Sequence, residues 1–94
     1  MGKPLSLEKN TMEISLEISM YPLNEEYKQQ ILAFIDGLNS YENLEVITNP
    51  MSTQVFGDFE EVMHAFTIET KKVFTDISRV MMVTKIFNHN LLDA

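Results

Sequence analysis

The sequence predicts an α+β protein with the ferredoxin-like order β-α-β-β-α-β, a four-stranded antiparallel sheet with two helices on one face. Apolar residues alternate with polar ones over residues 12–20, which is typical of a strand with one buried face. Two later segments repeat apolar residues at helical spacing. A turn signal at Asn49-Pro50 divides two short strands, and right-handed crossovers around that hairpin leave the first and third strands central.

The chain length predicts one domain. Its 94 residues can build a single two-layer core. We expect a flexible lead-in over residues 1–11, the domain over residues 12–88 and a tail over residues 89–94. A chain this small gains stability by burying a further face against a partner.

Charge and composition exclude several classes of function. The net charge of −7 argues against nucleic acid, which requires clustered Lys and Arg. Without cysteine the chain forms no disulfide, thiolate zinc site or thiol nucleophile. His64 and His89 lack the spacing of a metal-binding pair, so we expect no metal and no cofactor. The sequence shows neither an apolar run of about 20 residues nor a signal-peptide core, so we expect a cytoplasmic protein that binds no membrane.

The first strand is predicted over residues 12–20, and the run Tyr21-Pro22-Leu23 ends it. Its apolar side chains occupy alternate positions and therefore share one face, the core face. The core face carries Ile14, Leu16, Ile18 and Met20, and the other face carries Glu13, Ser15, Glu17 and Ser19.

The first helix is expected to start at Asn24, which can cap it. Glu25 and Glu26 would then lie in its first turn, where the helix dipole favours acids. Gly37 and Asn39 mark its end. The apolar stripe comprises Tyr27, Ile31, Phe34, Ile35 and Leu38.

The middle of the chain predicts a hairpin and a second helix. Strands are expected over residues 44–48 and 51–56, and Gly57-Asp58 ends the second. Asp58 and Glu61 form a capping-box-like start for the helix, and Thr75-Asp76 breaks it. The apolar stripe of this helix comprises Phe59, Val62, Met63, Phe66 and Val73.

The last strand, over residues 78–88, is apolar on both faces. A strand of this kind is covered on both faces, yet the two helices are expected on one side of the sheet. We therefore expect a homodimer in which a second copy covers the open face. One face carries Val80, Met82 and Ile86, the other carries Met81, Val83 and Phe87, and the sequence does not decide which set contacts the helices.

Two stretches, ISLEISMYPL over residues 14–23 and NPMSTQVFGDF over residues 49–59, resemble the YkoF-like thiamine/hydroxymethylpyrimidine-binding family. The resemblance covers residues 12–87. It implies a ferredoxin-like fold, sheet-to-sheet pairing of two units, and binding of thiamine or its pyrimidine precursor. Some members carry two tandem units, but this chain carries one, so its pairing would join two chains.

An aminopyrimidine presents an amino donor beside ring-nitrogen acceptors, which carboxylates, hydroxyls and amides complement. We expect Glu17 to bind the aminopyrimidine, Ser52 and Thr53 to orient it, and Tyr21, Met51 and Phe56 to pack on rings. The predicted ligand-binding residues are Ser15, Glu17, Ser19, Tyr21, Asn49, Met51, Ser52, Thr53 and Gln54.

Each of these residues also has an ordinary structural interpretation. Glu17 is equally expected as a solvated sheet residue, the polar residues of the third strand as strand surface, and Asn49 as a turn residue. The leading hypothesis is non-catalytic ligand binding; the alternative is a structural or regulatory dimeric module without a ligand. The alternative gains if Ser15, Glu17 and Ser19 are all satisfied by protein groups. An enzyme is disfavoured, because Arg79 is the single arginine and no glycine-rich loop precedes a helix.

Overall fold

The computed structural model describes residues 12–93, so the predicted lead-in and Ala94 lie outside it. The predicted order of elements and the α+β, ferredoxin-like class are confirmed. The elements are β1 (Glu13–Pro22), α2 (Tyr27–Asn39), β2 (Glu45–Thr48), β3 (Thr53–Asp58), α3 (Phe59–Asp76) and β4 (Val80–Phe87).

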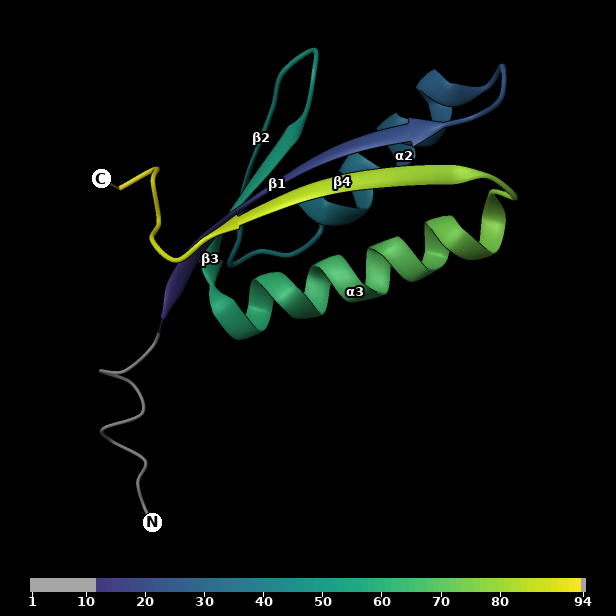
Figure 1. Cartoon of the computed structure of the whole chain (residues 1–94). Helices are drawn as coiled ribbons and strands as arrows, with labels where there is room; N and C mark the ends of the chain where they lie inside the picture. Colours follow the sequence, from purple (N-terminus) through teal and green to yellow (C-terminus); the bar gives the residue numbers. More distant parts are fainter. Residues whose placement is uncertain (1–11, 94) are drawn as a thin grey trace.

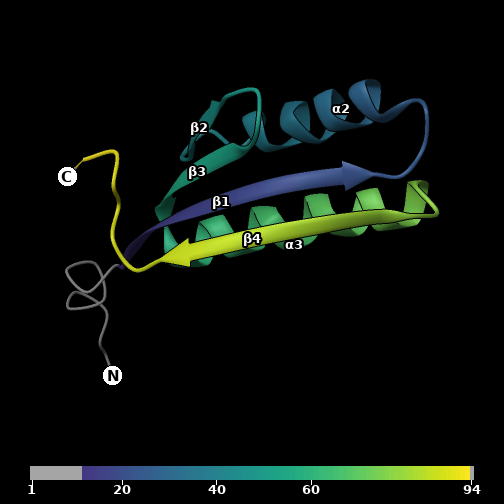
Figure 2. The same cartoon turned by 45° about the horizontal axis from the view of Figure 1, so that its top comes forward.

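The four strands form one sheet in the order β2-β3-β1-β4, and each pair of neighbours is antiparallel. The first and third strands are therefore central, as predicted. Both helices cover the same face of the sheet, and the other face remains open (Figures 1 and 2). Within residues 12–93, no helix is both long enough and apolar enough to cross a membrane.

The main core lies between the helices and the sheet. The alternating residues of β1 form its floor, and the apolar stripes of α2 and α3 cover them. Burying one such side chain stabilises the fold by about 1.5–3 kcal/mol. The most deeply buried large side chains are Ile14, Leu16, Ile18, Leu38, Val55 and Val62.

The start of α2 differs from the prediction. Asn24 does not cap the helix; its side-chain oxygen accepts a hydrogen bond from the backbone N–H of Glu26 at 2.8 Å, which forms a turn before the helix. The helix begins at Tyr27, its N-cap residue is Glu26, and no side chain caps it. The acids Glu25 and Glu26 therefore precede the first turn instead of lying in it. Asparagine favours both turns and helix caps, because its side-chain oxygen can accept a backbone hydrogen bond in either geometry.

Strand boundaries also moved. β1 continues through Tyr21 to Pro22, two residues beyond the predicted end. β3 begins at Thr53 and ends at Asp58, so Met51 and Ser52 lie in the turn before it. Gly57 therefore belongs to the strand that it was expected to end.

The run Phe56-Gly57-Asp58 has a separate structural reason at each position. Phe56 is buried but lies outside the main core cluster. Gly57 has φ +156°, which favours glycine, and a Cβ there would also lie 2.8 Å from Cδ2 of Leu44. Asp58 caps α3, because its Oδ2 accepts from the N–H of Glu61 at 3.1 Å, as predicted.

The register of β4 settles which face contacts the helices. Met82 pairs with the core residue Met20, so Val80 and Met82 face the helices and pack against the core. Met81, Val83 and Phe87 lie on the open face and are 56%, 49% and 47% exposed. The part of the open face that carries Met81 and Val83 has no cover within residues 12–93.

Candidate functional site

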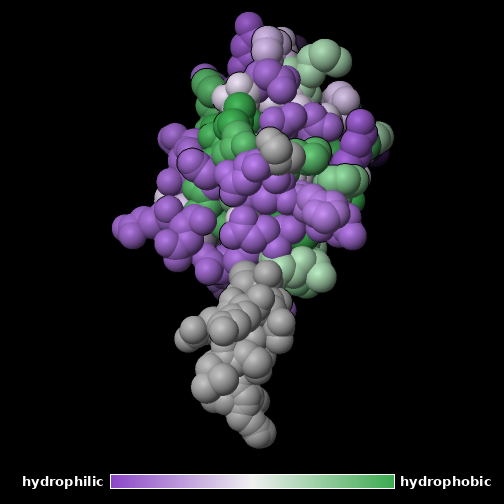
Figure 3. Space-filling model, turned by 90° about the vertical axis from the view of Figure 1, so that its left-hand side faces the viewer, coloured by the Kyte–Doolittle hydropathy of each residue, from purple (hydrophilic) through white to green (hydrophobic). Residues whose placement is uncertain are grey.

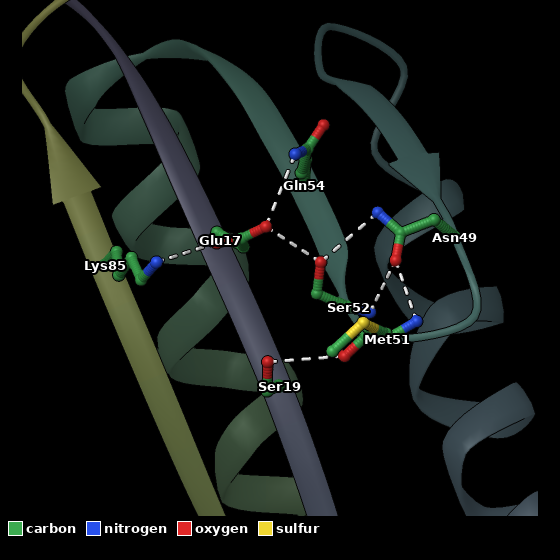
Figure 4. A network of polar contacts seen from close by, with 7 residues as sticks. All are labelled: Glu17, Ser19, Asn49, Met51, Ser52, Gln54 and Lys85. Carbon is green, nitrogen blue, oxygen red and sulfur yellow. Dashed lines mark hydrogen bonds and ion pairs between the residues drawn. The ribbon is translucent and has the colours of Figure 1, made fainter.

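Glu17 is the centre of a polar network on the open face of the sheet. In the register it lies between Gln54 of β3 and Lys85 of β4. Its Oε2 accepts hydrogen bonds from Oγ of Ser52 at 2.9 Å and from Nε2 of Gln54 at 3.4 Å. Its Oε1 lies 3.7 Å from Nζ of Lys85 (Figure 4). Three strands or their ends thus converge on one carboxylate.

These contacts keep Glu17 ionised. The hydrogen bonds from Ser52 and then Gln54 lower the pKa of this carboxyl below its ordinary value, desolvation opposes them, and the charge of Lys85 adds to the lowering. The Glu17 side chain is 33% exposed, so a ligand can reach it. At neutral pH the site therefore presents a fixed negative charge.

The hairpin turn positions Ser52. Oδ1 of Asn49 accepts from the backbone N–H groups of Met51 at 2.8 Å and Ser52 at 2.9 Å, and its Nδ2 lies 3.4 Å from Oγ of Ser52. Oγ of Ser19 donates to the carbonyl of Met51 at 3.4 Å (Figure 4). Asn49 is thus a turn residue, which agrees with its structural interpretation, and it holds the hydroxyl that contacts Glu17.

A cavity of about 580 Å³ lies on the open face beside this network. Its polar lining is Ser15, Glu17, Gln54 and Lys85, and the remainder is apolar. Figure 3 views the end of the molecule where the chain ends and shows hydrophobic side chains exposed there among hydrophilic ones. The apolar lining comprises Leu16, Ile47, Phe56, Ile86, Phe87, Leu91 and Leu92.

A second cavity, of about 470 Å³, lies where the hairpin turn, the end of β1 and α2 meet. Tyr21, Met51 and Thr53 line it, together with Tyr27 and Ile31 of α2. It contains no carboxylate or ammonium group. The predicted ligand-binding residues are therefore divided between two cavities, and Ser52 is the link, because it lines the second and bonds Glu17 in the first.

A family model for thiamine-binding proteins matches residues 16–90 of the 94-residue chain. The chain belongs to the thiamine-binding protein family. The resemblance read from residues 14–23 and 49–59 is thereby confirmed. The matched region includes Glu17, Ser52, Gln54 and Lys85 and ends before Leu91. Among the curated proteins, none matches this sequence.

Solved structures share the fold of this thiamine-binding family member. A hypothetical protein of Methanocaldococcus jannascii is 28% identical with a TM-score of 0.71, over 84% of this chain and 82% of that one. A Thermotoga maritima protein, described as a candidate for thiamine biosynthesis or salvage, is 21% identical with a TM-score of 0.72, over 80% and 82%. A domain of unknown function from Bacillus cereus is 10% identical with a TM-score of 0.65, over 86% and 80%. The latter two likenesses concern the fold alone.

The structure joins six of the nine predicted residues in one network. Glu17, Ser52 and Gln54 bond to one another directly, and Ser19, Asn49 and the backbone of Met51 join them through the turn. Three predicted residues, Ser15, Tyr21 and Thr53, do not join it. Thr53 pairs with Ile18, faces the helices and is 5% exposed, so it cannot orient a ligand held on the open face. Ser15 is 8% exposed and bonds to residues near the C-terminus.

The side chains of Tyr21 and Met51, two of the three expected to pack on rings, lie away from Glu17. Tyr21 and Met51 are 51% and 85% exposed and line the hairpin cavity. Phe56, the third, lines the open-face cavity beside Glu17.

Several residues of the site have no signal in the sequence. Lys85 follows from the register between β1 and β4, which the sequence leaves undetermined. The sequence groups Phe87 with Met81 and Val83, and it leaves open only the choice of face for this group. Leu91 and Leu92 belong to a segment without periodicity that the sequence indicates only as a tail. Among residues 12–93, no three His, Cys, Asp or Glu side chains gather as a metal site. His64 contacts the ring of Tyr41, and His89 contacts that of Phe87.

Proposed function

We propose that this protein binds thiamine or its hydroxymethylpyrimidine moiety, without turnover, at the Glu17 network on the open face. The observation that carries the proposal is an ionised carboxylate held by Ser52 and Gln54 beside an apolar-walled cavity. Membership of the thiamine-binding protein family supports the choice of ligand.

The chemistry of the network complements an aminopyrimidine. The carboxylate of Glu17 accepts from an amino group or a protonated ring nitrogen, and the second contact is charge-assisted. Gln54 turns its nitrogen toward Glu17 and its oxygen away, which leaves a further acceptor in the same region (Figure 4). The thiazolium of thiamine is a cation, which suits a chain of net charge −7.

The cavity supplies the apolar part of the site. Its volume of about 580 Å³ fits a small molecule, since ligand sites span roughly 300–1,000 Å³. Phe56 and Phe87 line it and offer aromatic surface to a ring. Apolar walls also exclude water, which strengthens the polar contacts to Glu17.

The lowered pKa of Glu17 supports binding without turnover. A general base works best when its pKa lies near the operating pH, and the contacts of Glu17 move its pKa in the opposite direction.

A homodimer is the second part of the proposal. The open face exposes Tyr21, Ile47, Met81, Val83 and Phe87, which together form an apolar surface that a second copy would bury. Because the cavity opens on this face, packing of two sheets would also shield a bound ligand from solvent.

One observation favours the alternative of a dimeric interaction module without a ligand. Ser15, Glu17 and Ser19 each have a hydrogen-bond or ion-pair partner within the protein. The network is thus stable when empty, and a ligand must compete with Lys85 or Gln54 for Glu17.

Calorimetric titration with thiamine and with hydroxymethylpyrimidine distinguishes a ligand-binding protein from an interaction module without a ligand. We expect the wild type to bind saturably. Glu17→Gln should bind with an affinity at least roughly tenfold lower than that of the wild type, because it keeps the shape of the side chain but loses the charge. Glu45→Gln is the matched control, because Glu45 is exposed on β2 and lies outside the network. Absence of binding by the wild type would favour the interaction module.

A further inference from the structure

The chain after β4 returns to β1 at the end of the open face. Oγ of Ser15 donates to the carbonyl of His89 at 2.7 Å and accepts from the N–H of Leu91 at 2.9 Å. Nδ2 of Asn90 donates to Oε1 of Glu13 at 2.7 Å. Three hydrogen bonds thus fasten this segment, residues 89–93, to the first strand.

The segment has its own local order. Oδ1 of Asn90 accepts from the N–H of Leu92 at 3.0 Å, and its carbonyl accepts from the N–H of Asp93 at 3.2 Å. Asn90 therefore closes a turn that contains Leu91 and Leu92. The bond from the Leu91 N–H to Ser15 holds this turn against β1. Both leucines line the open-face cavity.

At the same end of the open face, two side chains are buried, although Phe87, which also pairs with Ser15, is 47% exposed. Ser15 and Phe56 pair in the register and are 8% and 6% exposed. Val83 and Met81, further along the same face, are about half exposed. Since Phe56 lies outside the main core cluster, its burial has a different origin, and it shares the cavity with the two leucines.

We infer that residues 89–93 are a C-terminal strap that forms one wall of the ligand cavity, and that Ser15 is the positioning residue that fastens it. This inference rests on the function proposed above. Ser15 acts through the strap and does not contact the ligand, because its hydroxyl already donates to His89 and accepts from Leu91. The leucines then supply apolar wall to the cavity that Glu17 also lines.

The strap and the ligand must stabilise each other. If the fastened strap improves ligand binding, then a bound ligand must favour the fastened strap by the same factor. The strap also extends past residue 90, where the family match ends, so the Leu91 and Leu92 wall is a feature of this chain beyond the matched region.

Amide hydrogen exchange at Leu91 measures the fastening directly, because this N–H bonds to Ser15. We expect Ser15→Ala to accelerate that exchange by roughly threefold to tenfold, the effect of one lost neutral hydrogen bond. Ser15→Thr keeps a hydroxyl and should restore protection. Ser78→Ala is the matched control, because Ser78 is exposed before the opposite end of β4. Equal exchange in the wild type and Ser15→Ala would overturn the inference.

Titration with hydroxymethylpyrimidine and thiamine tests the coupling to the site. We expect Ser15→Ala and a chain ending at Asn88 to lose roughly threefold or more in affinity, mainly through faster dissociation. Ligand should slow Leu91 exchange in the wild type and leave it unchanged in Ser15→Ala. Ser15→Thr should recover affinity together with exchange protection, which a general loss of stability would not produce.

The outcomes separate the two proposals. If the wild type binds and both strap variants bind equally well with equal dissociation rates, the strap is no wall of the site, and the proposed function stands. If the wild type binds neither compound, the proposed function fails and the role of the strap in binding fails with it. The chain ending at Asn88 retains every strand and helix, so its thermal unfolding midpoint shows whether lost affinity reflects lost fold.

Discussion

Glu17 shows how a single residue can be structural and available to a ligand together. It accepts from Ser52 and Gln54, which bind the turn and β3 to β1, and its side chain remains 33% exposed. The hydrogen bonds from Ser52 and Gln54 stabilise the negative charge, and the exposed ammonium of Lys85 balances part of it. That combination is what an anionic recognition site for a cationic or protonated ring requires.

The lowered pKa of Glu17 gives a pH dependence. The ionised form is favoured in the folded protein, so its contribution to stability and binding is present above the ordinary carboxyl pKa of 4.5 and is lost as the pH falls through the lower folded value. We expect the affinity ratio between wild type and Glu17→Gln for thiamine to stay constant from pH 7 to about 5 and to fall toward one in more acidic solution. Titrations of both proteins along one pH series measure it, and a constant ratio at acid pH would contradict the assignment.

Glu69 is a buried carboxylate of a different kind. It is 5% exposed between the helices, and Gly37 leaves room for its Oε1, which a Cβ would displace. Its Oε2 accepts from Oη of Tyr41 at 2.8 Å and lies 3.4 Å from Nζ of Lys72. A buried charge of this kind persists only when it is paired, so Tyr41 is a requirement of the packing between α2 and α3.

We expect Tyr41→Phe to lower the free energy of unfolding by about 1–3 kcal/mol at pH 7, because Glu69 loses its shortest bond. Desolvation first, and then the neighbouring Glu69, raise the pKa of Tyr41 above its ordinary value of 10.0. The phenol's contribution is therefore complete below pH 10 and is lost as the pH rises from there through the folded value. In urea unfolding, the difference in the free energy of unfolding between wild type and Tyr41→Phe should become smaller in alkaline solution. A difference that stays the same at every pH would refute this.

Among the elements, the two helices begin in different ways. α3 has a side-chain cap, since Asp58 accepts from Glu61, whereas α2 starts after an asparagine turn without a side-chain cap. The first turn of α3 also carries Glu60 and Glu61, which favour its positive end.

Removal of the cap should weaken α3 specifically. We expect Asp58→Ala to lower the free energy of unfolding by about 0.5–2 kcal/mol, because an N–H of the first turn loses its acceptor. Asp58→Asn keeps an acceptor and should retain most of the stability. Chemical denaturation midpoints of the three proteins measure this, and equal midpoints for Asp58→Ala and wild type would refute the capping assignment.

Periodicity predicted the elements well because it reports burial. It failed where a turn decides at which residue a strand begins. Asn49 extends its turn as far as Ser52, so β3 begins two residues later than expected. Successive strand residues point to opposite faces, so Ser52, Thr53 and Gln54 could not all serve one site. Glu17 and Gln54 were placed correctly because the alternation of β1 and the central position of β3 require it.

At the scale of the whole molecule, the sequence indicated an uncovered face but not how one end of it is covered. The strap forms through isolated contacts, Ser15 to His89 and Leu91, over more than 70 positions of sequence. Such contacts leave no period for a pattern to reveal. The contribution of Lys85 was hidden for a related reason, because only the register of β1 with β4 places it opposite Glu17.

The exposed part of the open face leads to the last prediction. We expect the wild type to sediment as a dimer at micromolar concentration, because Met81, Val83 and Phe87 would bury apolar area against a second sheet. Val83→Lys should yield monomers, since a lysine at the centre of that surface would lose its hydration.

Thr84→Lys is the matched control for this experiment. Thr84 is the next residue of the same strand, is exposed, and pairs with Ile18 of the helix-facing side, so its substitution adds the same charge to the other face. We expect this variant to remain dimeric. A monomeric wild type would refute the proposed dimer. If Val83→Lys and Thr84→Lys both dissociate the dimer, the edge of β4, and not its open face, joins the chains. The cavity opens on the face that carries Val83. We therefore expect Val83→Lys, and not Thr84→Lys, to weaken thiamine binding as well as to dissociate the dimer.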